Sequence, residues 1–86
     1  MKMLPIGFGN YVNPDHVVSV VSPDSAPIKR LVQETREKGR LVDASFGRST
    51  RSVIVTDSPN IILSALTPEV LSARLEGRPE PKEAVE

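Results

Sequence analysis

Two neighbouring segments in the middle of the chain carry apolar residues at consecutive positions, residues 51–57 (RSVIVTD) and 60–66 (NIILSAL). A strand with one wet face alternates apolar and polar residues, so consecutive apolar residues predict strands that are covered on both faces. Helices are expected to cover one face. The other face is covered either by the same chain or by a neighbouring subunit, and the small number of predicted helices favours the neighbouring subunit.

The remaining apolar segments predict two more strands, a helix and a short second helix. Residues 3–6 form a short apolar strand, and the β-branched run 16–21 (HVVSVV) forms another. A helix opens within residues 22–27, where Asp24 or Ser25 caps the free N–H groups and Pro27 occupies the first turn. It ends near Lys38, before Gly39 as a structural C-terminal glycine. Residues 67–75 form the second helix.

Turns complete the predicted architecture. Gly7 and Gly9 flank Phe8 in a tight turn that needs positive φ and packs Phe8 inward. Residues 40–46 and 51–57 are predicted to pair as a hairpin through the turn 47–50, which begins at the structural glycine Gly47. The expected fold is therefore α+β, with two helices and a small antiparallel-rich sheet in the order β-β-α-β-β-β-α.

The chain length predicts one domain, residues 1–75, followed by a flexible charged tail, residues 76–86. A unit this short buries a marginal core, and small domains are usually supplemented by disulfides, a metal or a partner subunit. The sequence has no cysteine and a single histidine. Self-association into a homo-oligomer is therefore expected. With no cysteine, signal peptide or apolar run long enough to span a bilayer, the predicted location is the cytoplasm, without membrane contact.

Basic residues are concentrated in one part of this neutral chain. Residues 29–51 contain seven basic and three acidic residues, a local net charge of +4. Arginine and hydroxyl side chains on a rigid turn suit phosphate oxygens or a guanine edge. The candidate contacts to double-stranded DNA are Arg48, Ser49, Thr50, Arg51 and His16, with Lys29 and Arg30 as candidate phosphate contacts. A solvated turn without a ligand is the alternative.

Patterns of catalytic residues are missing, so we predict that the chain is not an enzyme and uses no cofactor, metal or small-molecule substrate. The single histidine, His16, lacks a second ligand or a nucleophile at a useful spacing, and is expected to face solvent or to contact phosphate when protonated. Residues 7–10 (GFGN) lack the third glycine of a dinucleotide site.

Four blocks of sequence (IGFGNYV, SPDSAPIKR, GRLVDASFGRSTRSVIVTDS and ILSALTPE) closely resemble the RemA-type family of bacterial regulators of extracellular-matrix genes. The resemblance spans residues 5 to about 75. It implies a cytoplasmic, nucleoid-associated regulator of transcription, for example of biofilm genes, that forms a ring, an octamer, and bends or wraps DNA around its outside.

The resemblance also implies which residues bind DNA. Arg48 matches the family's arginine on the turn, whereas Ser49 and His16 stand where the family carries basic residues. These two departures leave an alternative open, a structural or protein-interaction oligomer on the same scaffold with weak or no DNA binding.

Overall fold

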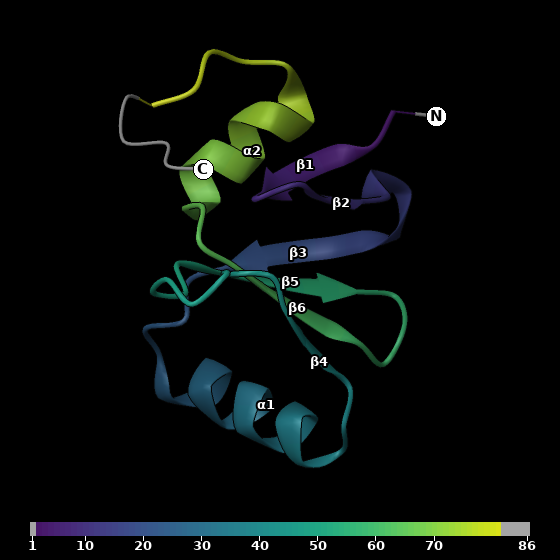
Figure 1. The fold of residues 1–86 in the computed structure, drawn as a ribbon, viewed down its shortest axis with the longest axis vertical. Coiled ribbons are helices and arrows are strands. Elements are labelled where there is room, and N and C mark those ends of the chain that lie inside the picture. The colour runs from purple at the N-terminus through teal and green to yellow at the C-terminus, as the bar shows by residue number, and fades with distance from the viewer. Residues whose placement is uncertain (1, 82–86) are drawn as a thin grey trace.

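A four-stranded sheet lies at the centre of the computed structural model, which describes residues 2–81 (Figure 1). Its strands, in spatial order, are β3 (Val17–Val21), β5 (Ser52–Thr56), β6 (Ile61–Ser64) and β4 (Leu41–Asp43). The pairs β3–β5 and β5–β6 are antiparallel, whereas β4 runs parallel to β6. With two helices beside this antiparallel-rich sheet, the predicted α+β class is confirmed.

The first turn of the chain joins two strands of a separate hairpin, β1 (Leu4–Gly7) and β2 (Asn10–Val12). The sequence prediction missed β2, so three strands rather than two precede the first helix. The backbone has φ of 105° at Gly7, 55° at Phe8 and 79° at Gly9, which confirms the predicted need for positive φ. A short 3₁₀ helix, Pro14–His16, follows, so His16 precedes β3 instead of opening it.

The first helix, α1 (Ala26–Glu37), begins and ends where its signals predict. Ser25 is the N-cap, and its Oγ accepts a hydrogen bond from the Ile28 amide at 3.4 Å. Pro27 lies in the first turn, where its missing N–H breaks no helical hydrogen bond. Gly39 follows the helix with φ of 70°, the left-handed conformation that glycine accepts without strain.

Both faces of the sheet are covered by the chain's own elements. Val53 and Ile54 are neighbours on β5 and both are fully buried, but they belong to different apolar clusters. Val53 packs with residues of α1 such as Leu31, and Ile54 packs with residues of α2 (Pro68–Glu76) and β1 such as Leu71. Figure 1 shows the resulting three layers, with α1 on one side of the sheet and α2 with the hairpin on the other. A neighbouring subunit is not needed to cover these strands.

The predicted hairpin between residues 40–46 and 51–57 is wrong. The strand after α1 is only Leu41–Asp43, and it pairs with β6 in parallel, while β5 lies between β3 and β6. Leu41 and Asp43 lie opposite Ile61 and Leu63, on the side of β6 that faces away from β5. Residues 44–51 are therefore a connection that crosses from one edge of the sheet to its centre.

The last helix, α2, starts after Thr67, whose Oγ1 accepts from the Val70 amide at 3.3 Å. It ends at Glu76, one residue later than predicted, and Gly77 caps it with φ of 68°. Arg74 of α2 donates two hydrogen bonds, at 2.9 and 3.1 Å, to the carboxylate of Glu80, which lies beyond the end of the helix. Flexibility of the tail 76–86 stays a prediction, and residues 82–86 lie outside the described residues.

Neither helix in the described part of the chain combines the length and the apolar character needed to cross a membrane.

Burial on both faces predicts that each face contributes to stability. Ile54→Ala and Leu63→Ala, which open a cavity in one cluster each, should each lower the free energy of unfolding by about 2–5 kcal/mol. Glu34→Ala, at an exposed position of α1, should change it by less than about 0.5 kcal/mol. Urea denaturation followed by circular dichroism measures all three. A loss confined to one of the two core variants would contradict a core on both faces.

Candidate nucleic-acid interface

The basic turn segment, residues 45–51, begins with a tight four-residue turn from Ser45 to Arg48. The Arg48 amide donates to the Ser45 carbonyl at 3.0 Å, and φ is positive at both central residues, 57° at Phe46 and 76° at Gly47. This sign pattern is that of a type I′ turn, which normally takes Asn-Gly. Gly47 suits it, whereas Phe46 in the left-handed region stores strain on the order of 1–3 kcal/mol.

Hydrogen bonds hold both ends of this segment. At the start, the Asp43 carboxylate accepts from the amide (2.9 Å) and the hydroxyl of Ser45. These two bonds, helped by the positive charge of Arg36, lower the pKa of Asp43 below its ordinary value. At the end, the Arg51 amide donates to the Ser64 carbonyl on β6 at 2.9 Å. The segment is thus fastened to the sheet, and its exposed side chains start from a fixed backbone.

Arg48 is the exposed cation of this turn. Its guanidinium lies over the Phe8 ring, with Cζ 5.6 Å from the ring centroid, a distance at which a cation and an aromatic ring attract each other. Within residues 2–81 no carboxylate forms an ion pair with Arg48. The guanidinium therefore keeps its charge and donors available to an external anion, while the ring beneath restricts its position.

The rest of the segment lines two shallow hollows on either side of Thr50. One, of about 380 Å³, is also lined by Lys29 and Arg36 of α1. The other, of about 410 Å³, is lined by Ser49 and Arg51 and by two carboxylates, Glu69 at the N-terminus of α2 and Asp24, which also lines the first hollow. The structure thus brings the predicted contacts Arg48, Ser49, Thr50, Arg51 and Lys29 together at one end of the molecule, in agreement with the proximity of these connections in Figure 1.

Two neighbouring bases of α1 differ in position. Lys29 lines the hollow beside Thr50, and Arg30, one residue later, does not. Arg36 follows Lys29 by seven residues, which is close to two helical turns, so both fall on the same flank. The sequence prediction counted Arg36 in the local charge but did not include it among the candidate contacts. Its i, i+7 spacing from Lys29 was the signal that could have found it.

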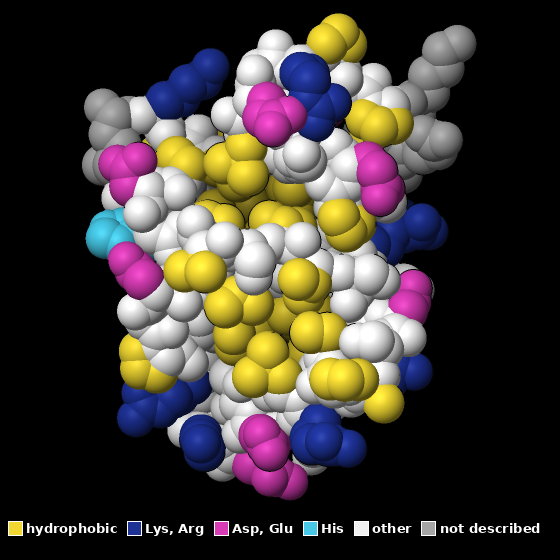
Figure 2. All heavy atoms as spheres, turned by 180° about the vertical axis from the view of Figure 1, so that it is seen from behind, with side chains coloured by type: hydrophobic (Ala, Val, Ile, Leu, Met, Phe, Trp, Pro, Cys, Tyr) yellow, Lys and Arg dark blue, Asp and Glu magenta, His cyan; other side chains and the backbone are white. Residues whose placement is uncertain are grey.

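His16 lies at the opposite end of the sheet. β3 and β5 are antiparallel, with Val17 opposite Thr56, so His16 is beside Asp57 at the far end of β5 from Arg51. Arg51 and Asp57 are six positions apart along extended backbone, which is about 20 Å at 3.3 Å per residue. Figure 2 shows the histidine (cyan) at the side of the molecule with acidic side chains close to it. Within one chain, His16 and the basic turn segment form two separate surfaces.

An ion pair with Asp57 changes the charge state of His16. The Nδ1 atom lies 2.9 Å from Oδ2 and 3.2 Å from Oδ1 of that carboxylate, and both side chains are more than half exposed. The hydrogen bond and the negative charge of Asp57 raise the pKa of His16 above its ordinary value of 6.5. The proton is therefore favoured, but the neighbouring carboxylate offsets the resulting charge.

A metal site is not indicated at either surface, since no cluster of three or more His, Asp or Glu side chains occurs among residues 2–81.

These features define a small α+β protein with an anchored, exposed basic turn. The family described as "RemA-like: Extracellular matrix regulatory protein A-like" matches residues 3–75. Similar proteins, each named "Putative regulatory protein", occur in several bacteria. The protein of Alkaliphilus metalliredigens is 55% identical over 96% of this chain and 89% of its own length. That of Acetivibrio thermocellus is 60% identical over 87% and 81% of the two lengths, and that of Geobacillus thermodenitrificans is 56% identical over 90% and 88%.

The chain belongs to the RemA-like family of extracellular matrix regulatory proteins, as its sequence blocks predicted, and it is a regulatory protein.

The His16–Asp57 pair predicts a pH dependence. Because the pKa of His16 is raised in the folded chain, its protonated form stabilises the fold; this contribution is complete below about 6.5 and disappears as pH rises through the raised value. Asp57→Asn should move the pKa of His16 down toward 6.5. An NMR titration measures this directly, since the chain has one histidine. An unchanged titration curve in the variant would show that the pair does not form in solution.

Proposed function

We propose that this protein is a homo-oligomeric DNA-binding regulator of transcription, in which Arg48 on the basic turn segment makes the principal contact to double-stranded DNA. The observation that carries this proposal is the position of Arg48, exposed on an anchored turn without a carboxylate partner in the described chain. Arg51 follows it in the same segment, and Lys29 and Arg36 line the hollow beside Thr50. Such a cluster supplies charge for phosphates and planar donors for groove edges.

Repetition by symmetry supplies the affinity that one chain lacks. A single chain offers only a few basic contacts, whereas several copies on one duplex act together through their high effective concentration. We propose a closed ring, an octamer, with the basic turn segments on its outside. Each phosphate neutralised adds about −0.9 to the slope of log affinity against log salt, so the assembly binds DNA with a steep salt dependence.

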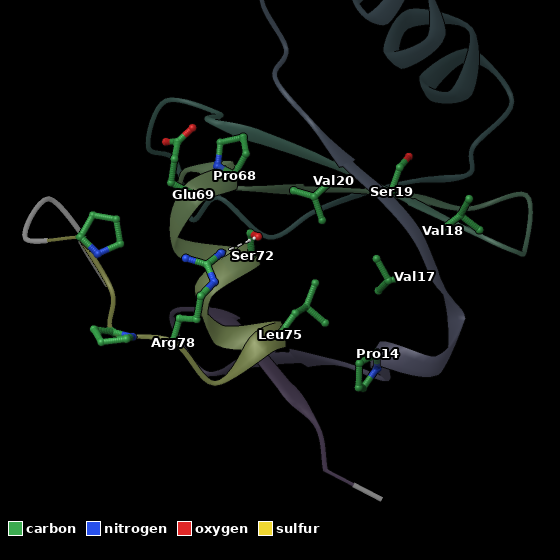
Figure 3. A pocket seen from close by; sticks show the side chains of 12 residues that line it. Pro14, Val17, Val18, Ser19, Val20, Pro68, Glu69, Ser72, Leu75 and Arg78 are labelled. Atoms are coloured by element: carbon green, nitrogen blue, oxygen red, sulfur yellow. Dashed lines mark hydrogen bonds between the residues drawn. The ribbon is translucent and has the colours of Figure 1, made fainter.

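Strand β3 and the groove beside it are our candidate contact between copies. β3 is an edge strand whose second side has no partner strand in the described chain, and edges of this kind pair readily with another chain. A groove of about 610 Å³ runs between β3 and α2, lined by Val17, Val18 and Val20 on one side and Pro68, Ser72 and Leu75 on the other (Figure 3).

Apolar surface supports the same assembly. Val18 is 66% exposed and Leu75 is 41% exposed, although both are large apolar side chains. Figure 2 shows further apolar side chains gathered in the middle of one face of the molecule. A second copy seated on this surface would enlarge the core of a chain that is marginally short on its own.

Wrapping around such a ring requires DNA that bends. Smooth bending of 20–30 base pairs costs on the order of 1–6 kcal/mol, so easily bent sequences with several contacts in phase are favoured over one sharp motif. The resemblance to matrix regulators supports promoters as the proposed targets, and the proposed location is cytoplasmic and nucleoid-associated.

The second candidate function is a structural or protein-interaction oligomer with weak or no DNA binding. Two points favour it: the Asp57 carboxylate offsets the charge of His16, and Ser49 supplies a hydroxyl where the family resemblance implies a base. It is distinguished by the same assembly in light scattering without DNA binding at low salt.

Arg48→Ala should weaken binding to a promoter-length duplex about tenfold or more and reduce the salt slope by about 0.9 for each subunit engaged. Fluorescence anisotropy at several salt concentrations measures both. Lys29→Ala and Arg30→Ala form a matched pair that removes the same charge from adjacent positions, and Lys29→Ala should weaken binding more because Lys29 lines the hollow beside Thr50. Wild-type affinity in the Arg48 variant would refute this contact surface.

Restoring bases at the two divergent positions should strengthen binding. The double variant His16→Arg, Ser49→Arg adds two planar cations per chain, so affinity should rise by about tenfold or more at moderate salt. The same anisotropy assay applies, with Val42→Arg, at an exposed position of the edge strand β4, as a control for added charge. If the control gains as much as the double variant, the effect is one of net charge alone.

A further inference from the structure

Phe46 is the most exposed large apolar side chain among residues 2–81, and its backbone conformation is unfavourable for phenylalanine. The side chain is 76% exposed, and its φ of 57° lies in the left-handed region. Asn is the usual residue at this position of a type I′ turn, and it would relieve the strain. Burial within the chain therefore does not explain the ring. An aromatic side chain kept here despite the strain points to a contact outside the described chain.

A second aromatic ring holds Phe46 in place. Phe8, in the turn between β1 and β2, stacks on it with ring centroids 5.2 Å apart and planes inclined by 20°. The guanidinium of Arg48 lies over the same Phe8 ring, with Cζ 5.6 Å from the centroid. Since both distances are measured from one centroid, the Phe46 ring and the guanidinium are at most about 11 Å apart. An exposed apolar ring and an available cation are thus fixed side by side on one turn.

We propose that Phe46 enters the major groove of duplex DNA and packs its exposed edge against the C5 methyl group of a thymine, while Arg48 binds a phosphate or a guanine edge nearby. This inference rests on the DNA binding proposed above and names the base feature that the same surface recognises. The thymine methyl is an apolar group on the floor of the major groove, and phenylalanine is one of the side chains that contact it. At about 3.4 Å per base pair, the thymine lies within about three base pairs of the Arg48 contact.

The shape of the turn favours the major groove over the minor groove. The turn from Ser45 to Arg48 brings two backbone segments together, and the side chains of Phe46 and Arg48 are both exposed on it. The major groove is about 12 Å wide and admits a two-stranded ribbon, whereas the minor groove is only about 6 Å wide.

The proposed wrapping of DNA favours the same groove. A ring inserted into the minor groove would unstack a base step and kink the duplex away from the protein, which opposes wrapping around repeated subunits. Contact with a methyl group at a base edge leaves the bases stacked, so it is compatible with bending toward the protein.

Repetition turns this small contact into a preference for thymine. One methyl group removed from water is worth roughly fourfold in affinity, so a single subunit discriminates weakly. Subunits on one side of a duplex meet its major groove at intervals of about 10–10.5 base pairs or multiples of that spacing. We therefore expect thymines in phase with the helical repeat to be favoured, without one sharp motif.

Deoxyuridine tests the contact, because it lacks the methyl group of thymine and keeps the base pair and the minor-groove edge. A promoter-length duplex with deoxyuridine at every thymine position should bind the wild-type protein at least about fourfold more weakly than the thymine duplex. Phe46→Asn should bind both duplexes equally, with about the affinity of the wild type for the deoxyuridine duplex. Fluorescence anisotropy at moderate salt measures all four affinities.

The variant should keep its fold, because Asn tolerates the left-handed conformation that Phe46 adopts under strain. We expect a melting temperature no lower than that of the wild type and an unchanged assembly mass in light scattering. Two further variants serve as controls. Phe46→Tyr keeps the ring and should keep the preference for thymine. Tyr11→Thr removes another exposed aromatic side chain, on β2 and outside the two turns, and should bind and discriminate as the wild type does.

The outcomes separate this inference from the proposed function. If the wild type binds both duplexes equally, or if Phe46→Asn still prefers thymine, the methyl contact is wrong and the proposed function stands. A smaller assembly mass in Phe46→Asn also overturns the contact, because Phe46 then packs against another subunit. If the wild type binds no duplex at low salt, the proposed function fails, and the methyl contact fails with it.

Discussion

Burial of β5 on both of its faces is the constraint on which the rest of the structure depends. Val53 and Ile54 follow each other along one strand, so their side chains point to opposite sides of the sheet, and both are fully buried. Each therefore requires its own apolar layer. The chain satisfies both requirements with one helix on either side of the sheet, and this arrangement fixes where the two ends of β5 emerge.

The two ends of β5 carry different chemistry for that reason. At its start, the basic turn segment is tied to the sheet by the Arg51–Ser64 and Asp43–Ser45 hydrogen bonds, and this anchoring lets Phe46 persist in a strained conformation. At its end, Asp57 pairs with His16 in solvent, where a single ion pair contributes little to stability. The anchored cation and the neutralised one thus belong to opposite ends of β5, where Arg51 and Asp57 are about 20 Å apart.

The distribution of basic residues is the feature to relate to the regulatory family to which the chain belongs. The chain as a whole is neutral, yet Lys29 and Arg36 of α1 line the hollow beside the basic turn segment, whereas Lys38 and Arg40 line another hollow beside the turn between β5 and β6. Symmetric repetition of the basic turn segment would produce a strong local field, which is how so small a protein could hold DNA.

The sequence alone determined the elements whose signals are local. The caps and the apolar spacing of α1 located that helix, and the glycines predicted positive φ. The sequence blocks also identified the family. The β-branched and apolar runs located β3, β5 and β6, because such residues fit a buried sheet in any pairing.

Only the tertiary structure decided which strands are neighbours. Chain order made a hairpin of the strands on either side of residues 47–50, but β4 pairs with β6 in parallel instead, and this choice depends on apolar contacts between residues distant in sequence. The same long-range packing stacked Phe46 on Phe8, which are 38 positions apart, and placed His16 far from Arg48. Local propensity carries no information about such contacts, because their energy exists only once both layers close over the sheet.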